Sequence, residues 1–126
     1  MPSSLPAGEP APADGRLPDA ATASLGRQPF GCYVHVPFCQ TRCGYCDFNT
    51  YTAAELGHGV SRESYAGLVI AEARFARRVL GATETPVSSV FFGGGTPTLL
   101  PPGDLGAILR AIDGEFGLLP GAEVTV

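Results

Sequence analysis

Hydrophobic and polar positions divide the chain into a first part without periodicity and a second part with clear periods. Residues 1–28 are rich in Pro, Ala, Ser, Gly and Asp, and their apolar positions follow neither a helical nor a strand period. Such a segment cannot bury enough apolar surface to offset the entropy that it loses on ordering. We therefore expect a disordered leader over residues 1–28 and an ordered region over residues 29–126.

The ordered region alternates between the two periods of regular structure. Runs of β-branched and aromatic residues predict strands over residues 30–36, 87–92 and from residue 123 to the end. Apolar positions three and four residues apart predict a helix over residues 61–80 and a second helix from about Pro102. Strand, helix, strand, helix, strand is the order of an α/β fold with a parallel sheet.

Local signals set the expected ends and faces of these elements. Ser61 is a candidate N-cap and Gly81 is placed to end the first helix. Gly121 predicts a turn before the third strand. We expect Arg74, Arg77 and Arg78 on the outer face of the first helix. The apolar positions of the first helix that recur at helical spacing are Tyr65, Leu68, Val69, Phe75, Ala76 and Val79. The second helix should carry on one face Leu105, Ile108, Leu109, Ile112 and Phe116.

Composition narrows the class of protein. The chain has 126 residues, and with 44% hydrophobic residues it suits one ordered domain rather than a fully disordered chain. No apolar run approaches the roughly 18 residues of a membrane span. The net charge of −4 argues against a nucleic-acid binder. Three strands and two helices form a weak core alone, so we expect the N-terminal part of a larger domain.

Three of the four cysteines follow a C-x3-C-x2-C spacing at Cys39, Cys43 and Cys46. No secretory signal precedes them, and clustered cysteines in a reducing compartment bind metal more often than they form disulfides. Three thiolates can hold a 4Fe–4S cluster and leave one iron open for a ligand. A zinc site with Cys32 as the fourth ligand is the alternative, whereas the simplest role of Cys32 is that of a small apolar strand residue.

A glycine-rich loop, Gly93-Gly94-Gly95-Thr96-Pro97, follows the second predicted strand. Consecutive glycines let the backbone approach a ligand closely, and ligands of α/β sheets bind at the carboxyl ends of the strands. Both the cysteine loop and the glycine loop are expected at that edge. The loop lacks the lysine of a phosphate loop. A tight turn is the alternative reading of the three glycines.

Two histidines and one arginine have open roles. His35 shares a strand face with Tyr33, which suits either a hydrogen-bonded strand histidine or a residue that tunes a bound cofactor. His58 lies between glycines and is expected to face solvent. Arg42 lies between two cysteines and either tunes a cluster by its charge or is a solvated loop residue.

The C-x3-C-x2-C motif after a first strand, with the aromatic Tyr45 before its last cysteine, resembles the signature of the radical S-adenosylmethionine superfamily. This resemblance implies the N-terminal portion of a partial (βα)6 barrel, in which Cys39, Cys43 and Cys46 bind a 4Fe–4S cluster. The open iron would bind S-adenosylmethionine. In its G-G-G-T-P form the glycine loop resembles a second superfamily motif, which implies contacts to S-adenosylmethionine from Tyr33, Tyr45, Gly94, Gly95 and Thr96.

The entry to the motif narrows the resemblance to one branch. Tyr33-Val-His-Val-Pro-Phe-Cys39 is similar to the branch of oxygen-independent coproporphyrinogen III oxidases and their relatives. The oxidases carry a fourth cysteine two positions after the third, whereas this chain has Phe48 there. Cys46-Asp-Phe-Asn-Thr-Tyr51 is instead similar to the HemW family of heme chaperones.

The HemW resemblance implies a heme chaperone that passes heme, its cargo, to acceptor proteins. It implies a cytoplasmic protein with an electron donor such as a flavodoxin or ferredoxin, and membrane association only through partners. Two alternatives stay open: a coproporphyrinogen III oxidase that performs radical decarboxylation, and a zinc-stapled structural module. Whether the chain acts as an enzyme depends on this choice.

Overall fold

The computed structural model describes residues 6–39 and 61–126. Within these residues the order of elements is strand, helix, strand, helix, strand, preceded by one short helix. Their bounds are α1 (Asp19–Thr22), β1 (Phe30–Val36), α2 (Arg62–Leu80), β2 (Val87–Gly94), a 3-10 turn (Pro97–Leu99), α3 (Pro102–Phe116) and β3 (Leu118–Thr125).

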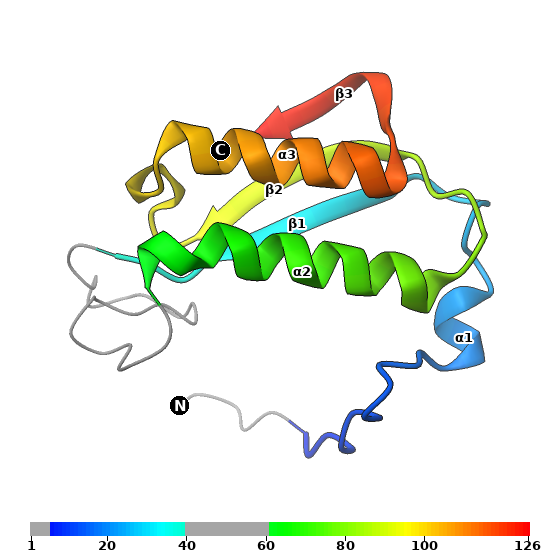
Figure 1. The fold of residues 1–126 in the computed structure, drawn as a ribbon. Coiled ribbons are helices and arrows are strands. Elements are labelled where there is room, and N and C mark those ends of the chain that lie inside the picture. Colours follow the sequence, from blue (N-terminus) through cyan, green and yellow to red (C-terminus); the bar gives the residue numbers. More distant parts are fainter. Residues whose placement is uncertain (1–5, 40–60) are drawn as a thin grey trace.

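The three strands form one parallel sheet in the order β1-β2-β3. Helices α2 and α3 lie side by side on one face of this sheet, and each connects one strand to the next (Figure 1). Because all strands run in the same direction, their carboxyl ends meet at one edge. The α/β fold with parallel strands is therefore confirmed.

The core lies between the sheet and these two helices. Alternate residues of a strand point to opposite faces, so Val34 and Val36 of β1 are buried against the helices while Tyr33, the residue before Val34, is exposed. The buried side chains that form the core are Val34, Val36, Phe38, Tyr65, Ala66, Val87, Val90, Phe92, Leu100, Ile108 and Ile112. None of the described helices is long and apolar enough to cross a membrane.

Helix α2 begins and ends where the sequence predicts. The Ser61 side chain accepts a hydrogen bond from the Ser64 backbone N–H, and the Ser64 side chain returns one to the Ser61 backbone, which closes a capping box. Gly81 follows the last turn with a φ of 71°. Not all of the apolar positions at helical spacing face the core, because Leu68 and Phe75 are 51% and 39% exposed.

The reason is the position of α2 at the edge of the sheet. β1 is an edge strand of the described sheet, so no described strand lies beyond it to cover the outer side of α2. Leu68 lines a groove of about 530 Å³ between α2 and β1. Phe75 lies against Gly15 of the N-terminal segment, where a side chain on Gly15 would clash with its ring.

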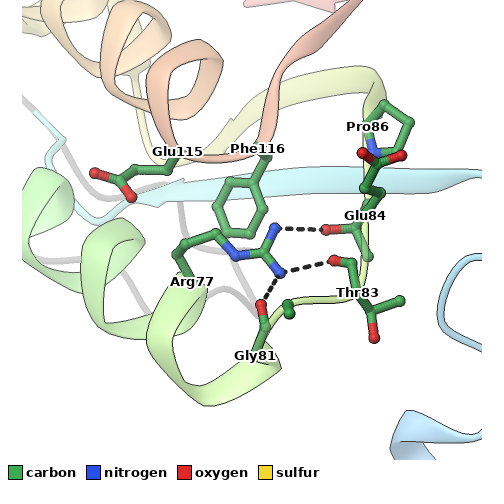
Figure 2. A pocket seen from close by; sticks show the side chains of 9 residues that line it. Arg77, Gly81, Thr83, Glu84, Pro86, Glu115 and Phe116 are labelled. Atoms are coloured by element: carbon green, nitrogen blue, oxygen red, sulfur yellow. Dashed lines mark hydrogen bonds between the residues drawn. The ribbon is translucent and has the colours of Figure 1, made fainter.

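Arg77 corrects the expectation that three arginines lie on the outer face of α2. Its guanidinium donates to the carbonyls of Gly81 and Thr83 at 2.6 and 2.8 Å, and to the Thr85 hydroxyl at 3.2 Å. It also lies 5.0 Å from the centroid of the Phe116 ring. Figure 2 shows this pocket of about 470 Å³, in which Arg77 ties α2 to the loop that enters β2.

The first and last segments differ from expectation in one respect each. Residues 19–22 form the short helix α1 inside the leader that was expected to lack regular structure, although the helix buries no residue. β3 begins at Leu118 rather than at residue 123. Gly121, with a φ of 76°, lies inside a bulge of β3, where the pairing with β2 passes from Leu118 to Glu123.

Candidate functional site

The segment after β1 and the glycine loop are joined at the carboxyl edge of the sheet, and Gly93 and Gly94, expected in the loop, are the last two residues of β2. The backbone N–H of Gly95 donates to the carbonyl of Val36, and that of Thr96 donates to the carbonyl of Phe38, both at 2.7 Å. These two bonds continue the pairing of β1 with β2 beyond the strands. They place the glycine loop directly beside Cys39, as the sequence predicts for the two loops.

The three glycines of this loop, Gly93 to Gly95, form a strip against which residues of the first motif pack closely. A Cβ on Gly95 would stand 2.8 Å from Cys39 Sγ and would also collide with the Phe38 carbonyl. A Cβ on Gly94 would stand 2.8 Å from His35 Cε1. Gly94 also has a φ of 104°, which L side chains rarely adopt. Glycine is therefore required at these positions because residues of the first motif already occupy the space that side chains would need.

Tyr33 lies on the sheet face opposite the helices. Its ring stacks on Phe91 with centroids 5.9 Å apart and an angle of 19° between the planes. Its hydroxyl lies 2.9 Å from His35 Nδ1, at hydrogen-bond distance. A Cβ on Gly93 would stand 3.0 Å from the Tyr33 ring and 2.5 Å from the Phe91 ring. Because 56% of Tyr33 is exposed, its ring forms part of an open surface beside the strip.

Tyr65 of α2 supports the outer edge of β1. Its hydroxyl donates to the backbone carbonyl of His35, and its ring meets Phe38 edge-on with centroids 5.3 Å apart. Burial, followed by the charges of Glu72 and Tyr33, raises the pKa of Tyr65 to about 12. Tyr65 therefore remains a neutral donor at physiological pH. The helical period identified it as an apolar core position and gave no signal of this hydrogen bond.

The two described cysteines have different surroundings. Cys32 packs against the hydrophobic core, and burial raises the pKa of its thiol. Cys39 is half-buried at the carboxyl edge of β1, beside the glycine strip. This contrast favours the interpretation of Cys32 as a small apolar strand residue over that of a zinc ligand.

The remaining predicted ligands lie outside the described residues. These are Cys43, Cys46 and Tyr45, together with the other positions that the sequence analysis discussed: Arg42, Phe48 and His58. Within residues 6–39 and 61–126, no three His, Cys, Asp or Glu side chains gather as metal ligands would. The structure thus brings together Cys39, Gly94, Gly95 and Thr96, with Tyr33 beside them.

Comparison with known proteins gives the family. The profile of the radical SAM superfamily matches residues 33–126. Over 103 residues the chain is 50% identical to the heme chaperone HemW of Mycobacterium tuberculosis (strain H37Rv). This match covers 82% of this chain and 26% of that protein. The chain is 42% identical over 94 residues to the mouse mitochondrial radical S-adenosyl methionine domain-containing protein 1, covering 75% of this chain and 20% of that protein.

A solved structure has the same fold. Coproporphyrinogen III oxidase (HemN) from Escherichia coli, described as a radical SAM enzyme, superposes with a TM-score of 0.66 at 23% identity. The superposition covers 88% of this chain and 25% of the oxidase. The chain thus spans about a fifth to a quarter of the length of these relatives.

Proposed function

Because the chain belongs to the radical SAM superfamily, we propose that the carboxyl edge of its sheet binds a 4Fe–4S cluster and S-adenosylmethionine. We propose further that the protein containing it is a heme chaperone of the HemW type. The observation that carries the cofactor proposal is the packing of Gly95 against Cys39, which leaves the cysteine sulfur beside a strip of bare backbone.

Cys39 supplies the first thiolate for the cluster in this proposal. Its side chain is half-buried at the end of β1, where a parallel α/β sheet places its ligands. Cys43 and Cys46 would complete the set by their spacing in the sequence. Three thiolates satisfy three irons of a 4Fe–4S cluster, which leaves one iron for a second ligand.

S-adenosylmethionine would be held by the backbone of the glycine strip and by neighbouring side chains. Gly94 and Gly95 offer backbone without side chains. Thr96 follows Gly95 directly and would contribute the next contact. Tyr33 offers an exposed aromatic face beside the strip, and Tyr45 would contribute from the cysteine loop. When bound, the cluster supplies the electron that cleaves the sulfonium bond of S-adenosylmethionine.

The chaperone assignment rests on the relatives and on one sequence position. A relative named heme chaperone shares 50% of the aligned residues with this chain. Phe48 occupies the place where the oxidases carry a fourth cysteine. Heme would be the cargo, and the partners would be heme-acceptor proteins and an electron donor such as a flavodoxin or ferredoxin. We propose a cytoplasmic location, with membrane contact only through those partners.

A second candidate function is that of coproporphyrinogen III oxidase, because the chain shares its fold with that enzyme. The two functions differ in what the full-length protein does with tetrapyrroles. The chaperone should bind heme stably and transfer it, whereas the oxidase should release carbon dioxide from coproporphyrinogen.

The deciding experiment uses the full-length protein, reconstituted with iron and sulfide without oxygen. Heme binding by absorbance titration is measured on this preparation, and so is carbon dioxide release from coproporphyrinogen in the presence of S-adenosylmethionine and a chemical reductant. Stable heme binding without decarboxylation supports the chaperone. Decarboxylation without stable heme binding would replace it by the oxidase, and stoichiometric zinc without sulfide would favour the zinc-stapled module.

A further inference from the structure

Tyr33 is an exposed aromatic side chain that is nevertheless fixed on three sides. Phe91 stacks on its ring, the bare backbone of Gly93 lies beneath its edge, and His35 Nδ1 lies 2.9 Å from its hydroxyl. The stack and the glycine contact restrict the plane of the ring. Among the described residues, the contact with His35 is the one that involves the hydroxyl, which is the polar end of the side chain.

His35 is itself held in place from two directions. Its ring occupies the space that a side chain on Gly94 would need, with Cε1 and Nδ1 2.8 and 2.9 Å from the position of that Cβ. Its backbone carbonyl accepts a hydrogen bond from the Tyr65 hydroxyl of α2. The histidine therefore links the helix, the edge strand and the glycine strip to the exposed ring of Tyr33.

We infer that His35 is a positioning residue, which orients Tyr33 and thereby shapes the surface that receives S-adenosylmethionine. The inference rests on the proposed function for the identity of the ligand. Its structural part, that His35 orders the Tyr33 side chain, holds without any ligand.

The physical reason is preorganisation. A surface tyrosine loses side-chain freedom when a ligand packs against it, and a side chain that is already fixed loses less. Removal of the hydrogen bond between His35 and Tyr33 leaves the stack with Phe91 intact but frees the hydroxyl end. We expect weaker binding of S-adenosylmethionine by about three- to tenfold, the range that corresponds to one net hydrogen bond.

The substitutions separate the hydrogen bond from the bulk of the ring. Tyr33→Phe removes only the hydroxyl. In His35→Asn the amide lies near the place of Nδ1, whereas in His35→Gln it reaches toward the place of Nε2. Asn should therefore restore the contact with Tyr33, and Gln should not. Leu119→Ala, at an exposed position of β3, is the matched control.

The first readout needs no cofactor. In the cluster-free full-length protein with ring-labelled tyrosine, NMR measures the order of the Tyr33 ring. We expect the wild type and His35→Asn to show an ordered ring, and His35→Gln a more mobile one. An equally ordered ring in His35→Gln would overturn the inference, whatever the protein binds. If His35→Gln fails to fold, His35→Leu takes its place, because it also lacks a partner for the Tyr33 hydroxyl and should show the same mobile ring.

The second readout is the dissociation constant for S-adenosylmethionine on the reconstituted full-length protein, with iron content measured in parallel. His35→Gln, Tyr33→Phe and the double variant should all weaken binding to the same extent, with unchanged iron. Additive losses in the double variant, or a loss of iron in His35→Gln, would overturn the positioning role. A wild type without cluster or S-adenosylmethionine binding would instead refute the proposed function, and the NMR comparison would still decide whether His35 orders Tyr33.

Discussion

Gly95 and Cys39, 56 positions apart in the chain, lie so close that a single methyl group on Gly95 would stand 2.8 Å from the cysteine sulfur. The two residues are brought together by backbone hydrogen bonds that continue the pairing of β1 with β2. The glycine loop thus touches the cysteine motif directly. This contact explains why a glycine is needed there even before a ligand is considered.

Gly95→Ala should destabilise the fold and impair cluster loading. The new Cβ would meet the backbone of Phe38 as well as Cys39 Sγ, and backbone cannot rotate away as a long side chain can. Overpacking of this kind costs about 1–3 kcal/mol. Chemical denaturation of the full-length protein measures the stability, and iron analysis after reconstitution measures the loading.

Gly67→Ala is the control for that substitution. Gly67 lies inside α2, and nothing lies within 4 Å of a Cβ built on it. Alanine in a helix interior is more stable than glycine by about 0.5–1 kcal/mol. The control should therefore unfold at a higher denaturant concentration and keep its iron. Equal iron loss in both variants would contradict the role given to the Gly95 contact.

The cysteines should respond differently to substitution. Cys39→Ala and Cys43→Ala should each abolish cluster assembly, because three thiolates are needed for three irons. Cys32→Ala should leave it largely intact, because Cys32 packs against the core and its thiol pKa is raised by burial. Iron and sulfide analysis distinguishes the variants. If Cys32→Ala lost as much iron as Cys43→Ala, the ligand assignment would be wrong.

Arg77→Ala should destabilise the fold without affecting cluster loading. The guanidinium holds two loop carbonyls and the Thr85 hydroxyl, and Thr85 is only 2% exposed. Hydrogen bonds to a charged group are worth about 1.5–3 kcal/mol each, so a net loss of about 2 kcal/mol is expected after solvent replaces some of them. Thermal unfolding measures the loss.

Arg78→Ala is the counterpart on the same helix. Arg78 is exposed, and its described contact is with the Phe75 ring, 5.7 Å from the centroid. Its removal should change the stability by less than about 1 kcal/mol. A similar loss for Arg78→Ala and Arg77→Ala would mean that the loop contacts of Arg77 contribute nothing specific.

The raised pKa of Tyr65 predicts that the free energy of unfolding falls at alkaline pH. Its pKa is raised in the folded protein from the ordinary value of 10.0 to about 12, so the unfolded chain ionises first as the pH rises. The contribution of this group to stability is complete below pH 10 and is lost between pH 10 and about 12. Tyr65→Phe should be less stable at neutral pH, but its stability should fall less steeply over that interval. Denaturation at several pH values compares the two slopes.

Most of the fold could be predicted because the signals that set the helices and strands involve neighbouring residues and are therefore visible in the sequence. The capping role of Ser61 and the end of α2 at Gly81 depend on neighbouring positions only. The start of β3 was missed, because Pro120 and Gly121 are typical of a turn and only pairing with β2 shows that they belong to a bulge. Arg77 was misplaced because the carbonyls that it holds belong to a loop whose path is set by tertiary structure.

In the candidate site, too, features set by neighbouring residues could be predicted, whereas contacts set by tertiary structure could not. The motifs predicted that Cys39 and the glycine loop share an edge, since parallel strands align their carboxyl ends. The shared face of Tyr33 and His35 also follows from strand alternation, and the hydrogen bond between them agrees with the simpler role considered for His35. The contact of Tyr65 with the His35 carbonyl joins residues 30 positions apart, and no local pattern encodes it.

The most direct test of the central claim is electron paramagnetic resonance of the reduced full-length protein, reconstituted without oxygen, before and after addition of S-adenosylmethionine. The account predicts about four irons and four sulfides per chain and a 4Fe–4S signal that shifts when S-adenosylmethionine is added. A colourless protein that contains zinc and no inorganic sulfide would contradict it, as would a cluster signal that S-adenosylmethionine leaves unchanged.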